Sequence, residues 1–160
     1  NRKKKIKECS KGMKLKLSLA VALSHQARLL ILYEPTSGLD PVARDELLDI
    51  LLEYIEDENN SILFSTHITS DLDKIADYLT IIDNGKVFYT GLKDKLFEKY
   101  CIIKGGVEDL TPDLEKRLIG LQKGNTVFSA LLDVQDMGYI SDHIVVEKAT
   151  IDDILIHINK

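Results

Sequence analysis

Two short apolar runs separated by an amphipathic segment constrain the fold of this chain more than any other feature. "LLIL" begins at residue 29 and "SILFS" begins at residue 61, and the intervening "RDELLDILLEYIEDE" places its leucines at helical spacing. A short, continuous apolar run is typical of a strand buried on both faces of a parallel sheet. Because parallel strands need a crossover connection, residues 29–80 are expected to form strand, helix, strand and helix, the order of an α/β fold.

The flanking segments extend this pattern on both sides. Ser10 followed by "KGMKLKLSLAVALSHQ" predicts a helix with a serine N-cap. "TSDLDKIADYL" predicts a short helix with Ser70 and Asp73 at capping-box spacing. "LTIIDNGKVFYTG" predicts two antiparallel strands about an Asn84-Gly85 turn. The α/β core is therefore expected to end in an antiparallel hairpin.

The character of the sequence changes after a predicted connecting helix at "LKDKLFEKYC". The remainder predicts a short strand, a helix starting at Thr111-Pro112, strands near "TVFSALL" and "HIVVEK", and a last helix capped by Thr150 with Asp153. This mixture predicts a small α+β appendage. We divide the chain into a first domain of residues 1–97 and an accessory domain of residues 98–160.

Composition sets limits on the class of protein. The 160 residues are 44% hydrophobic and 29% charged, and no apolar run approaches the 18 or more residues of a membrane helix. Cys9 and Cys101 are too far apart to indicate a disulfide framework, and no signal-peptide pattern is present. The expected location is therefore the cytoplasm.

Basic residues gather near the start of the chain, although the net charge is −5. Residues 1–28 carry nine of them against Glu8 alone: Arg2, Lys3, Lys4, Lys5, Lys7, Lys11, Lys14, Lys16 and Arg28. Such a segment indicates phosphate nearby, in a nucleotide, a nucleic acid or a lipid, or else a solvated helix face.

A reactive side chain follows each predicted parallel strand. Glu34 comes directly after the first strand, and His67 comes after the second. Ligands of open parallel sheets bind beyond the carboxyl ends of the strands, so these two groups are expected at one site. A carboxylate can orient and deprotonate water, and an imidazole can donate a hydrogen bond to a transferring phosphoryl oxygen. A single histidine would more often be structural.

The segment "SKGM" at residues 10–13 predicts an anion site. It opens a helix, and backbone N–H groups and the helix dipole attract anions to such a position. Gly12 is expected to let a phosphate approach the backbone closely.

Taken in order, "SKGMK", "LLILYEPTSGLDP" and "STH" resemble the second half of an ATP-binding-cassette (ABC) ATPase domain, over roughly residues 8–92. The resemblance implies a partial P-loop NTPase core, with parallel strands and a C-terminal antiparallel hairpin, followed by the α+β appendage.

The resemblance also implies roles for individual residues. Glu34 matches the catalytic carboxylate of the family, and His67 matches its switch histidine. The signature motif, which contacts ATP bound mainly by a partner subunit, falls on Ser10, Lys11, Gly12 and Met13. The D-loop, which crosses the dimer interface, falls on Ser37, Gly38, Leu39 and Asp40.

Two departures from the family pattern limit what this chain is expected to do. The Walker A loop, G-x-x-x-x-G-K-[ST], and the glutamine loop are absent from the sequence, which predicts a C-terminal part of a longer protein that is inactive alone. Tyr33 occupies the place of the Walker B aspartate, which holds Mg²⁺ in the family. A phenol is neutral at pH 7 and supplies no charge to a metal, so no residue is assigned as a metal ligand and hydrolysis is expected to be impaired.

The leading hypothesis is an ATPase subunit of an ABC transporter, with ATP and Mg²⁺ as cofactors of the parent protein. The resemblance implies a homodimer or heterodimer of such subunits, peripheral on the inner face of the cell membrane and bound to a membrane permease. "VEKATIDDILIHI" resembles the end of C-terminal extensions in bacterial exporters, which favours export.

Two alternatives remain open. Tyr33 favours a degenerate, non-catalytic cassette that acts as a dimerisation or binding module. The lysines of residues 3–16 permit a soluble ABC ATPase that acts on nucleic acid or ribosomes. The sequence lacks a second cassette and a coiled-coil insertion, so a nucleic-acid partner is disfavoured.

Overall fold

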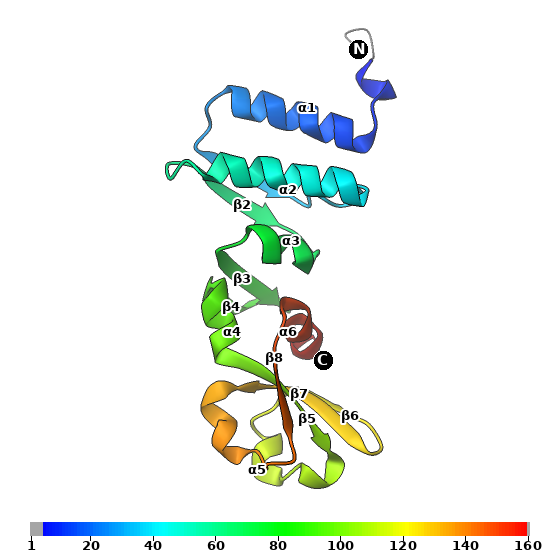
Figure 1. Cartoon of the computed structure of the whole chain (residues 1–160), viewed down its shortest axis with the longest axis vertical. Helices are drawn as coiled ribbons and strands as arrows, with labels where there is room; N and C mark the ends of the chain where they lie inside the picture. The colour runs from blue at the N-terminus through cyan, green and yellow to red at the C-terminus, as the bar shows by residue number, and fades with distance from the viewer. Residues whose placement is uncertain (1–4, 160) are drawn as a thin grey trace. The chain divides into compact units, whose positions relative to one another are not determined.

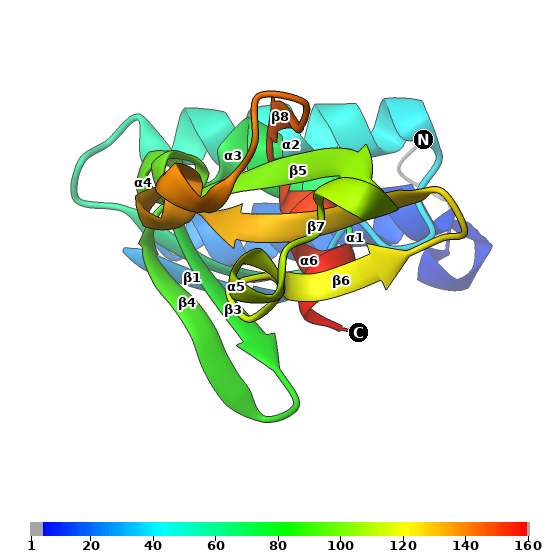
Figure 2. The same ribbon diagram turned by 90° about the horizontal axis from the view of Figure 1, so that it is seen from below.

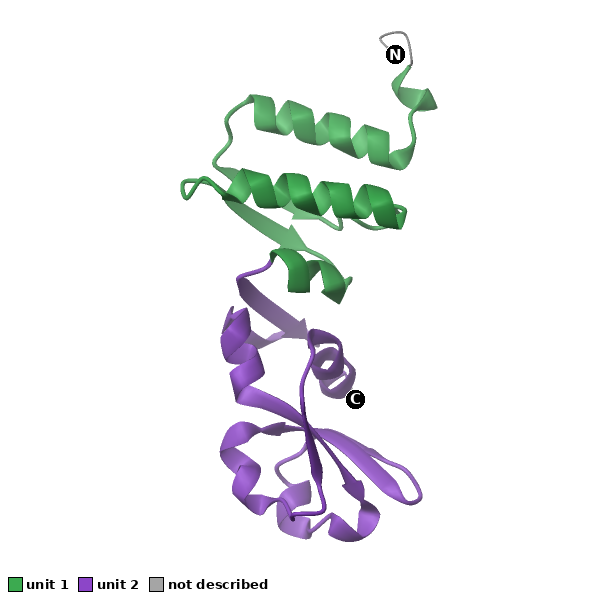
Figure 3. Cartoon of the chain, in the orientation of Figure 1, with its two compact units in different colours: residues 1–75 green, residues 76–160 purple. Residues whose placement is uncertain are grey.

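The structure is a computed structural model that describes residues 5–159, in two compact units (Figure 3). The first unit comprises residues 1–75 and the second comprises residues 76–160. Arg2, Lys3 and Lys4 of the predicted basic segment lie outside the described residues. The division at residue 75 reflects packing within each unit. The boundary expected between residues 97 and 98 separates the first domain from the accessory domain, and it stays a prediction.

The first unit contains the predicted strand, helix, strand and helix. Its elements are η1 (Ile6–Glu8), α1 (Lys11–Ser24), β1 (Leu29–Tyr33), α2 (Pro41–Ile55), β2 (Ser61–Ser65) and α3 (Thr69–Ile75). The Ser10 hydroxyl caps α1 by accepting from the Met13 N–H at 3.2 Å. Asp40 caps α2, with Pro41 in its first turn. β1 and β2 are parallel, and α1 and α2 lie side by side (Figure 1).

Only one face of the β1–β2 sheet is buried within the first unit. Leu30 of β1 packs into a core with residues of α1 and α2, namely Leu19, Leu47 and Leu51. The opposite face carries Leu29, Ile31 and Leu63, whose exposed fractions are 54%, 69% and 61%. Successive strand residues point to opposite faces, and among the described residues of this unit α1 and α2 cover one face alone. The prediction that "LLIL" is buried on both faces is therefore wrong.

Helix α3 begins one residue earlier than its predicted cap. Thr69 is its first residue, so Ser70 lies inside the helix and the predicted capping box with Asp73 is wrong. The Ser70 hydroxyl instead accepts from Arg44 of α2. The helix ends at Ile75, short of the predicted end, because β3 begins at Tyr78.

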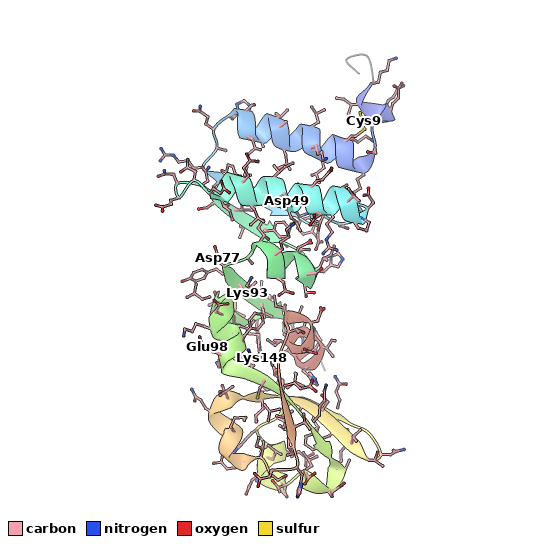
Figure 4. The ribbon with its side chains drawn as sticks, viewed as in Figure 1. Cys9, Asp49, Asp77, Lys93, Glu98 and Lys148 are labelled. Carbon is pink, nitrogen blue, oxygen red and sulfur yellow. The ribbon has the colours of Figure 1, made fainter. Side chains whose placement is uncertain are left out.

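The second unit opens with the predicted hairpin. β3 (Tyr78–Asp83) pairs with β4 (Lys86–Leu92) in an antiparallel ladder. Asn84 and Gly85 both have positive φ, +47° and +74°, as a two-residue hairpin turn requires. The Lys93 N–H then donates to the Asp77 carbonyl at 2.8 Å, where α4 (Lys93–Lys99) begins (Figure 4). The Asn84-Gly85 hairpin is therefore confirmed.

The rest of the second unit is built on a four-stranded antiparallel sheet in the order β6-β7-β5-β8. These strands are β5 (Tyr100–Gly106), β6 (Ile119–Lys123), β7 (Val127–Asp133) and β8 (Val145–Lys148). Figure 2 shows β5, β7 and β6 side by side. The connecting helices are η2 (Val107–Asp109), α5 (Pro112–Glu115) and η3 (Val134–Tyr139), and the chain ends in α6 (Ile151–Ile158). The predicted caps are found at Thr111 and Thr150.

Each face of the four-stranded sheet is covered differently. One face carries a core whose central members are completely buried, including Ile103, Leu114, Ala130 and Leu132. Helix α6 packs on β6 and β7. Gly120 of β6 makes this approach possible, because a Cβ on Gly120 would lie 1.8 Å from the His157 carbonyl oxygen.

Within residues 5–159, no helix combines the length and apolar character that crossing a membrane requires.

Candidate functional site

The structure brings Glu34 and His67 together at the ends of the two parallel strands. Glu34 follows β1, and its N–H donates to the Ser65 carbonyl of β2 at 2.8 Å. Its Oε2 lies 2.8 Å from His67 Nδ1, within ion-pair distance. The Glu34 side chain is 22% exposed, whereas that of His67 is 72% exposed. The two groups thus form one site with a sheltered carboxylate and an imidazole open to solvent.

Glu34 has an unusual backbone conformation and a buried carboxylate oxygen. Its φ of +47° is uncommon for a residue other than glycine, and such strain costs about 1–3 kcal/mol and clusters at functional sites. Its buried Oε2 has no aligned hydrogen bond from the described residues, because the contact with His67 has ion-pair distance without hydrogen-bond alignment. This oxygen can therefore accept a proton or a hydrogen bond from water.

Tyr33 lies beside this pair but does not provide a metal ligand set. Its side chain is 83% exposed and follows Leu29 and Ile31 along the open face of β1. Mg²⁺ takes oxygen ligands, typically carboxylates and water, and a phenol brings no charge. Across residues 5–159, no three His, Cys, Asp or Glu side chains are grouped as a metal site. Tyr33 therefore adds no charge for a Mg²⁺ at this edge of the sheet.

A second cluster joins the start of α1 to the loop before α2. A cavity of about 550 Å³ is lined by residues from both segments: Ser10, Lys11, Gly12, Met13, Lys16, Gly38, Leu39, Asp40, Val42, Ala43 and Glu46. The Lys11 ammonium donates to the Ser37 carbonyl oxygen. The predicted signature and D-loop segments of this chain therefore lie around one cavity, which we call the signature pocket.

The lining of the signature pocket combines two lysines, Lys11 and Lys16, with two carboxylates, Asp40 and Glu46. Backbone N–H groups at the start of α1 border it, and Lys11 and Lys16 add positive charge. Lys16 is partly neutralised by an ion pair with Glu46. Gly12 also lies close to α2, because a Cβ there would be 3.3 Å from the Ala43 Cβ, which is tighter than an ordinary contact. The nucleotide roles of these residues stay a prediction.

The sequence did not reveal a buried polar network that fixes the loop between the two clusters. The Asp71 side chain is completely buried, and it accepts from Arg44 Nε at 2.5 Å and from the Thr36 hydroxyl. Thr36 lies between Glu34 and the predicted D-loop. The network ties this loop to α2 and α3. The partners are 27 and 35 residues apart, so no local sequence pattern could have indicated them.

The fold and both clusters define a class of protein: an α/β chain with a carboxylate and an imidazole at the ends of parallel strands and a pocket at the start of a helix. Comparison with known proteins narrows this class. A family model described as "AAA domain, putative AbiEii toxin, Type IV TA system" matches residues 5–72. Among solved structures, the chain is similar to one titled "An inward-facing conformation of a putative metal-chelate type ABC transporter", with a TM-score of 0.52 and 19% identity, over 81% of this chain and 49% of that one.

Three curated relatives illustrate the similarity in sequence. The lantibiotic transport ATP-binding protein SrtF of Streptococcus pyogenes is 41% identical over 85 residues, covering 53% of this chain and 37% of that protein. The methionine import ATP-binding protein MetN 2 of Staphylococcus epidermidis is 37% identical over 114 residues, covering 69% and 33%. The bacitracin transport ATP-binding protein BcrA of Bacillus licheniformis is 40% identical over 85 residues, covering 53% and 28%.

These comparisons confirm the resemblance to ABC transporter ATP-binding proteins. The aligned region spans about a third of the length of these curated relatives. The structural similarity, at 19% identity, confirms the fold class alone: an α/β chain with parallel strands and an antiparallel hairpin.

Proposed function

We propose that this protein acts as the ATP-binding subunit of an ABC transporter and couples ATP hydrolysis to transport through a separate membrane permease. The observation that carries the proposal is the 2.8 Å contact between Glu34 and His67 at the ends of two parallel strands. A carboxylate that orients water beside an imidazole that contacts a phosphoryl oxygen is suited to phosphoryl transfer. The relatives named for lantibiotic, bacitracin and methionine transport support the same class of function.

The signature pocket supports an assembly of two ATP-binding subunits. A helix start with Lys11 beside it offers an anion site, and the residues here supply no complete cradle for a nucleoside triphosphate. In our proposal, the pocket of one subunit contacts the phosphates of ATP held mainly by its partner. The dimer lies on the cytoplasmic face of the membrane against the permease, and the likeness of the last residues to exporter extensions favours export.

Tyr33 lowers the rate that this site can reach. Metal charge stabilises the developing negative charge in phosphoryl transfer, and a neutral phenol contributes none. We therefore expect slow Mg-ATP turnover, with Glu34 as the residue that orients the attacking water and His67 as a donor to the transferred phosphoryl group.

The test measures Mg-ATP turnover by the full-length parent protein, reconstituted with its permease. Tyr33→Asp is expected to raise turnover at least about tenfold, the effect of lowering a barrier by about 1.4 kcal/mol. Glu34→Gln in the Tyr33→Asp background is expected to remove that turnover. Tyr78→Asp changes another exposed tyrosine at a strand end and serves as the matched control, with turnover unchanged. Turnover that survives Glu34→Gln would overturn the proposed role of this residue.

A degenerate cassette is the second candidate, and the exposed neutral phenol at position 33 is the observation that favours it. It predicts that ATP promotes dimerisation while neither the natural protein nor Tyr33→Asp hydrolyses ATP. Sedimentation with and without ATP separates the two candidates. Binding to nucleic acid that weakens steeply with salt would instead indicate the nucleic-acid alternative.

A further inference from the structure

A cavity of about 890 Å³ in the second unit has no part in the proposed ATP chemistry. It is lined by residues of all four strands and the loops beside them: Lys104, Gly105, Leu121, Gln122, Lys123, Gly124, Val127, Phe128, Ser129, His143 and Val145. Its volume falls within the range of about 300–1,000 Å³ that is typical of small-molecule sites. We call it the sheet cavity.

The floor of the sheet cavity is a row of side chains that crosses the whole sheet. Gln122 of β6 is opposite Ser129 of β7, Ser129 is opposite Lys104 of β5, and Lys104 is opposite Val145 of β8. Residues directly opposite in a ladder project from the same face, so these four side chains form one continuous strip. On this face α6 approaches the strip, where His157 contacts Ser129 and the charge of Lys104 helps to lower the pKa of the Asp153 carboxyl.

The lining of this cavity is positively charged in a protein of negative net charge. Lys104 and Lys123 supply the charge, His143 adds an imidazole, and the lining contains no aspartate or glutamate. Lys104 Nζ also pairs with Glu147 Oε2 at 2.6 Å, just outside the lining. An ammonium has three donors, so Lys104 can donate to Glu147 and to a bound anion together. The lining therefore favours an anionic ligand.

Two further features indicate a ligand with an apolar part and a fixed orientation. Val127 and Val145 are 62% and 55% exposed in the cavity, which leaves apolar surface that a ligand could cover. His157 is buried, and its Nδ1 lies 2.7 Å from the Gly120 carbonyl, which can only accept. Nδ1 therefore carries a proton, and Nε2 faces the Ser129 hydroxyl at 3.5 Å. A buried side chain thus positions a hydroxyl on the cavity floor.

We propose that the sheet cavity binds a small organic anion, a carboxylate or phosphate joined to an apolar group. The anionic head lies against Lys104 and the Gln122 amide, and the apolar part covers Val127 and Val145. Neither the ATP chemistry of the first unit nor any role of the relatives enters this assignment, so it stands independently of the proposed function.

The experiment is a nuclear magnetic resonance titration of the full chain with octanoate. The expected result is a set of saturable amide shifts centred on the strip of Lys104, Gln122, Ser129 and Val145. Acetate lacks the apolar part and octyl glucoside lacks the charge, so each is expected to bind at least about tenfold more weakly than octanoate.

Matched variants test the role of charge and of apolar surface. Lys104→Gln is expected to weaken octanoate binding roughly tenfold, the loss of one charged hydrogen bond. Lys116→Gln removes an exposed lysine outside the cavity and is expected to change nothing. Val145→Thr keeps the shape and the charge of the strip, and it is expected to weaken octanoate binding without affecting acetate.

Several outcomes would overturn the proposal. One is that octyl glucoside binds as tightly as octanoate. Another is that the amide shifts caused by octanoate are confined to the open face of β1 in the first unit. A third is that Lys104→Gln and Lys116→Gln bind octanoate with equal affinity. Vesicles of phosphatidylglycerol identify the source of the anion. Flotation with these vesicles that is lost in Lys104→Gln indicates a lipid headgroup, whereas octanoate binding without flotation indicates a soluble anion.

Discussion

The two units use different means to hold their sheets. In the second unit, one face of a four-stranded sheet carries a core of completely buried residues such as Ile103 and Leu132. In the first unit, the β1–β2 sheet has one covered face, and Ile31 and Leu63 on the other face remain largely exposed. Apolar burial is the main favourable term in folding, so the second unit is expected to owe its stability to its core.

The first unit compensates with buried polar contacts. Asp71 is completely buried and joins Arg44 and Thr36, whereas the second unit buries one polar side chain, His157, among its described residues. A buried, hydrogen-bonded charge restricts a loop to one conformation, and this loop connects Glu34 to the signature pocket. The comparison indicates that the first unit adds buried polar contacts to the apolar core around Leu30 and Leu51, whereas the second unit is held mainly by apolar packing.

The strongest test of this comparison removes a leucine from each unit. Leu132→Ala empties a completely buried site, and it is expected to lower the free energy of unfolding of the second unit by about 2–5 kcal/mol. Leu63→Ala removes a leucine that is already exposed, and it is expected to change the stability of the first unit by less than about 0.5 kcal/mol. Hydrogen exchange of the β7 and β2 amides measures each unit separately. Equal losses in the two variants would show that the open face of the first unit is covered in solution.

The next test concerns the polar network. Asp71→Asn keeps the shape of the side chain but removes the charge opposite Arg44, and it is expected to destabilise the first unit by about 1–3 kcal/mol. Asp49 lies exposed on α2 (Figure 4) and pairs with Lys74, so Asp49→Asn is the matched control, with an expected change below about 1 kcal/mol. Amide exchange in α3 provides the measurement. If Asp71→Asn were as mild as the control, the network would not hold the loop.

Sequence patterns predicted those elements whose cause is local. Ser10, Thr111 and Thr150 cap helices where expected, since a cap depends on residues within one turn. The Asn84-Gly85 hairpin follows from two residues that tolerate positive φ. Glu34 and His67 could be placed together because parallel strands end at the same edge of a sheet.

What the sequence could not predict depends on distant packing. The short strand β6 was not predicted, because Gly120 interrupts its apolar pattern. A glycine is needed at this position because α6, from the end of the chain, packs against it too closely for a Cβ. The predicted N-cap at Ser70 was wrong because α3 already begins at Thr69. The Ser70 hydroxyl accepts from Arg44, a residue 26 positions away that no local pattern indicates. The prediction that "LLIL" is buried on both faces was wrong because an apolar run does not reveal how many other elements pack on the strand.

The smallest expected effect compares a turn glycine from each unit. Gly38 and Gly85 both have positive φ, +69° and +74°, so a Cβ at either position adds backbone strain of about 1 kcal/mol. At Gly85 no atom lies within 4 Å of that Cβ, whereas at Gly38 it would lie 2.8 Å from Lys11 Nζ. Gly85→Ala is thus expected to cost the strain alone, and Gly38→Ala is expected to cost more because Lys11 must leave the Ser37 carbonyl.

Gly138→Ala is the control for this pair, because its Cβ meets open space and its backbone is not left-handed. Thermal unfolding of the three variants, followed by hydrogen exchange within each unit, measures the differences. If Gly38→Ala cost no more than Gly85→Ala, the Lys11 contact would contribute nothing to the first unit. The signature pocket would then be held by the N-caps of α1 and α2, and the contrast between polar positioning and apolar packing would rest on Asp71 alone.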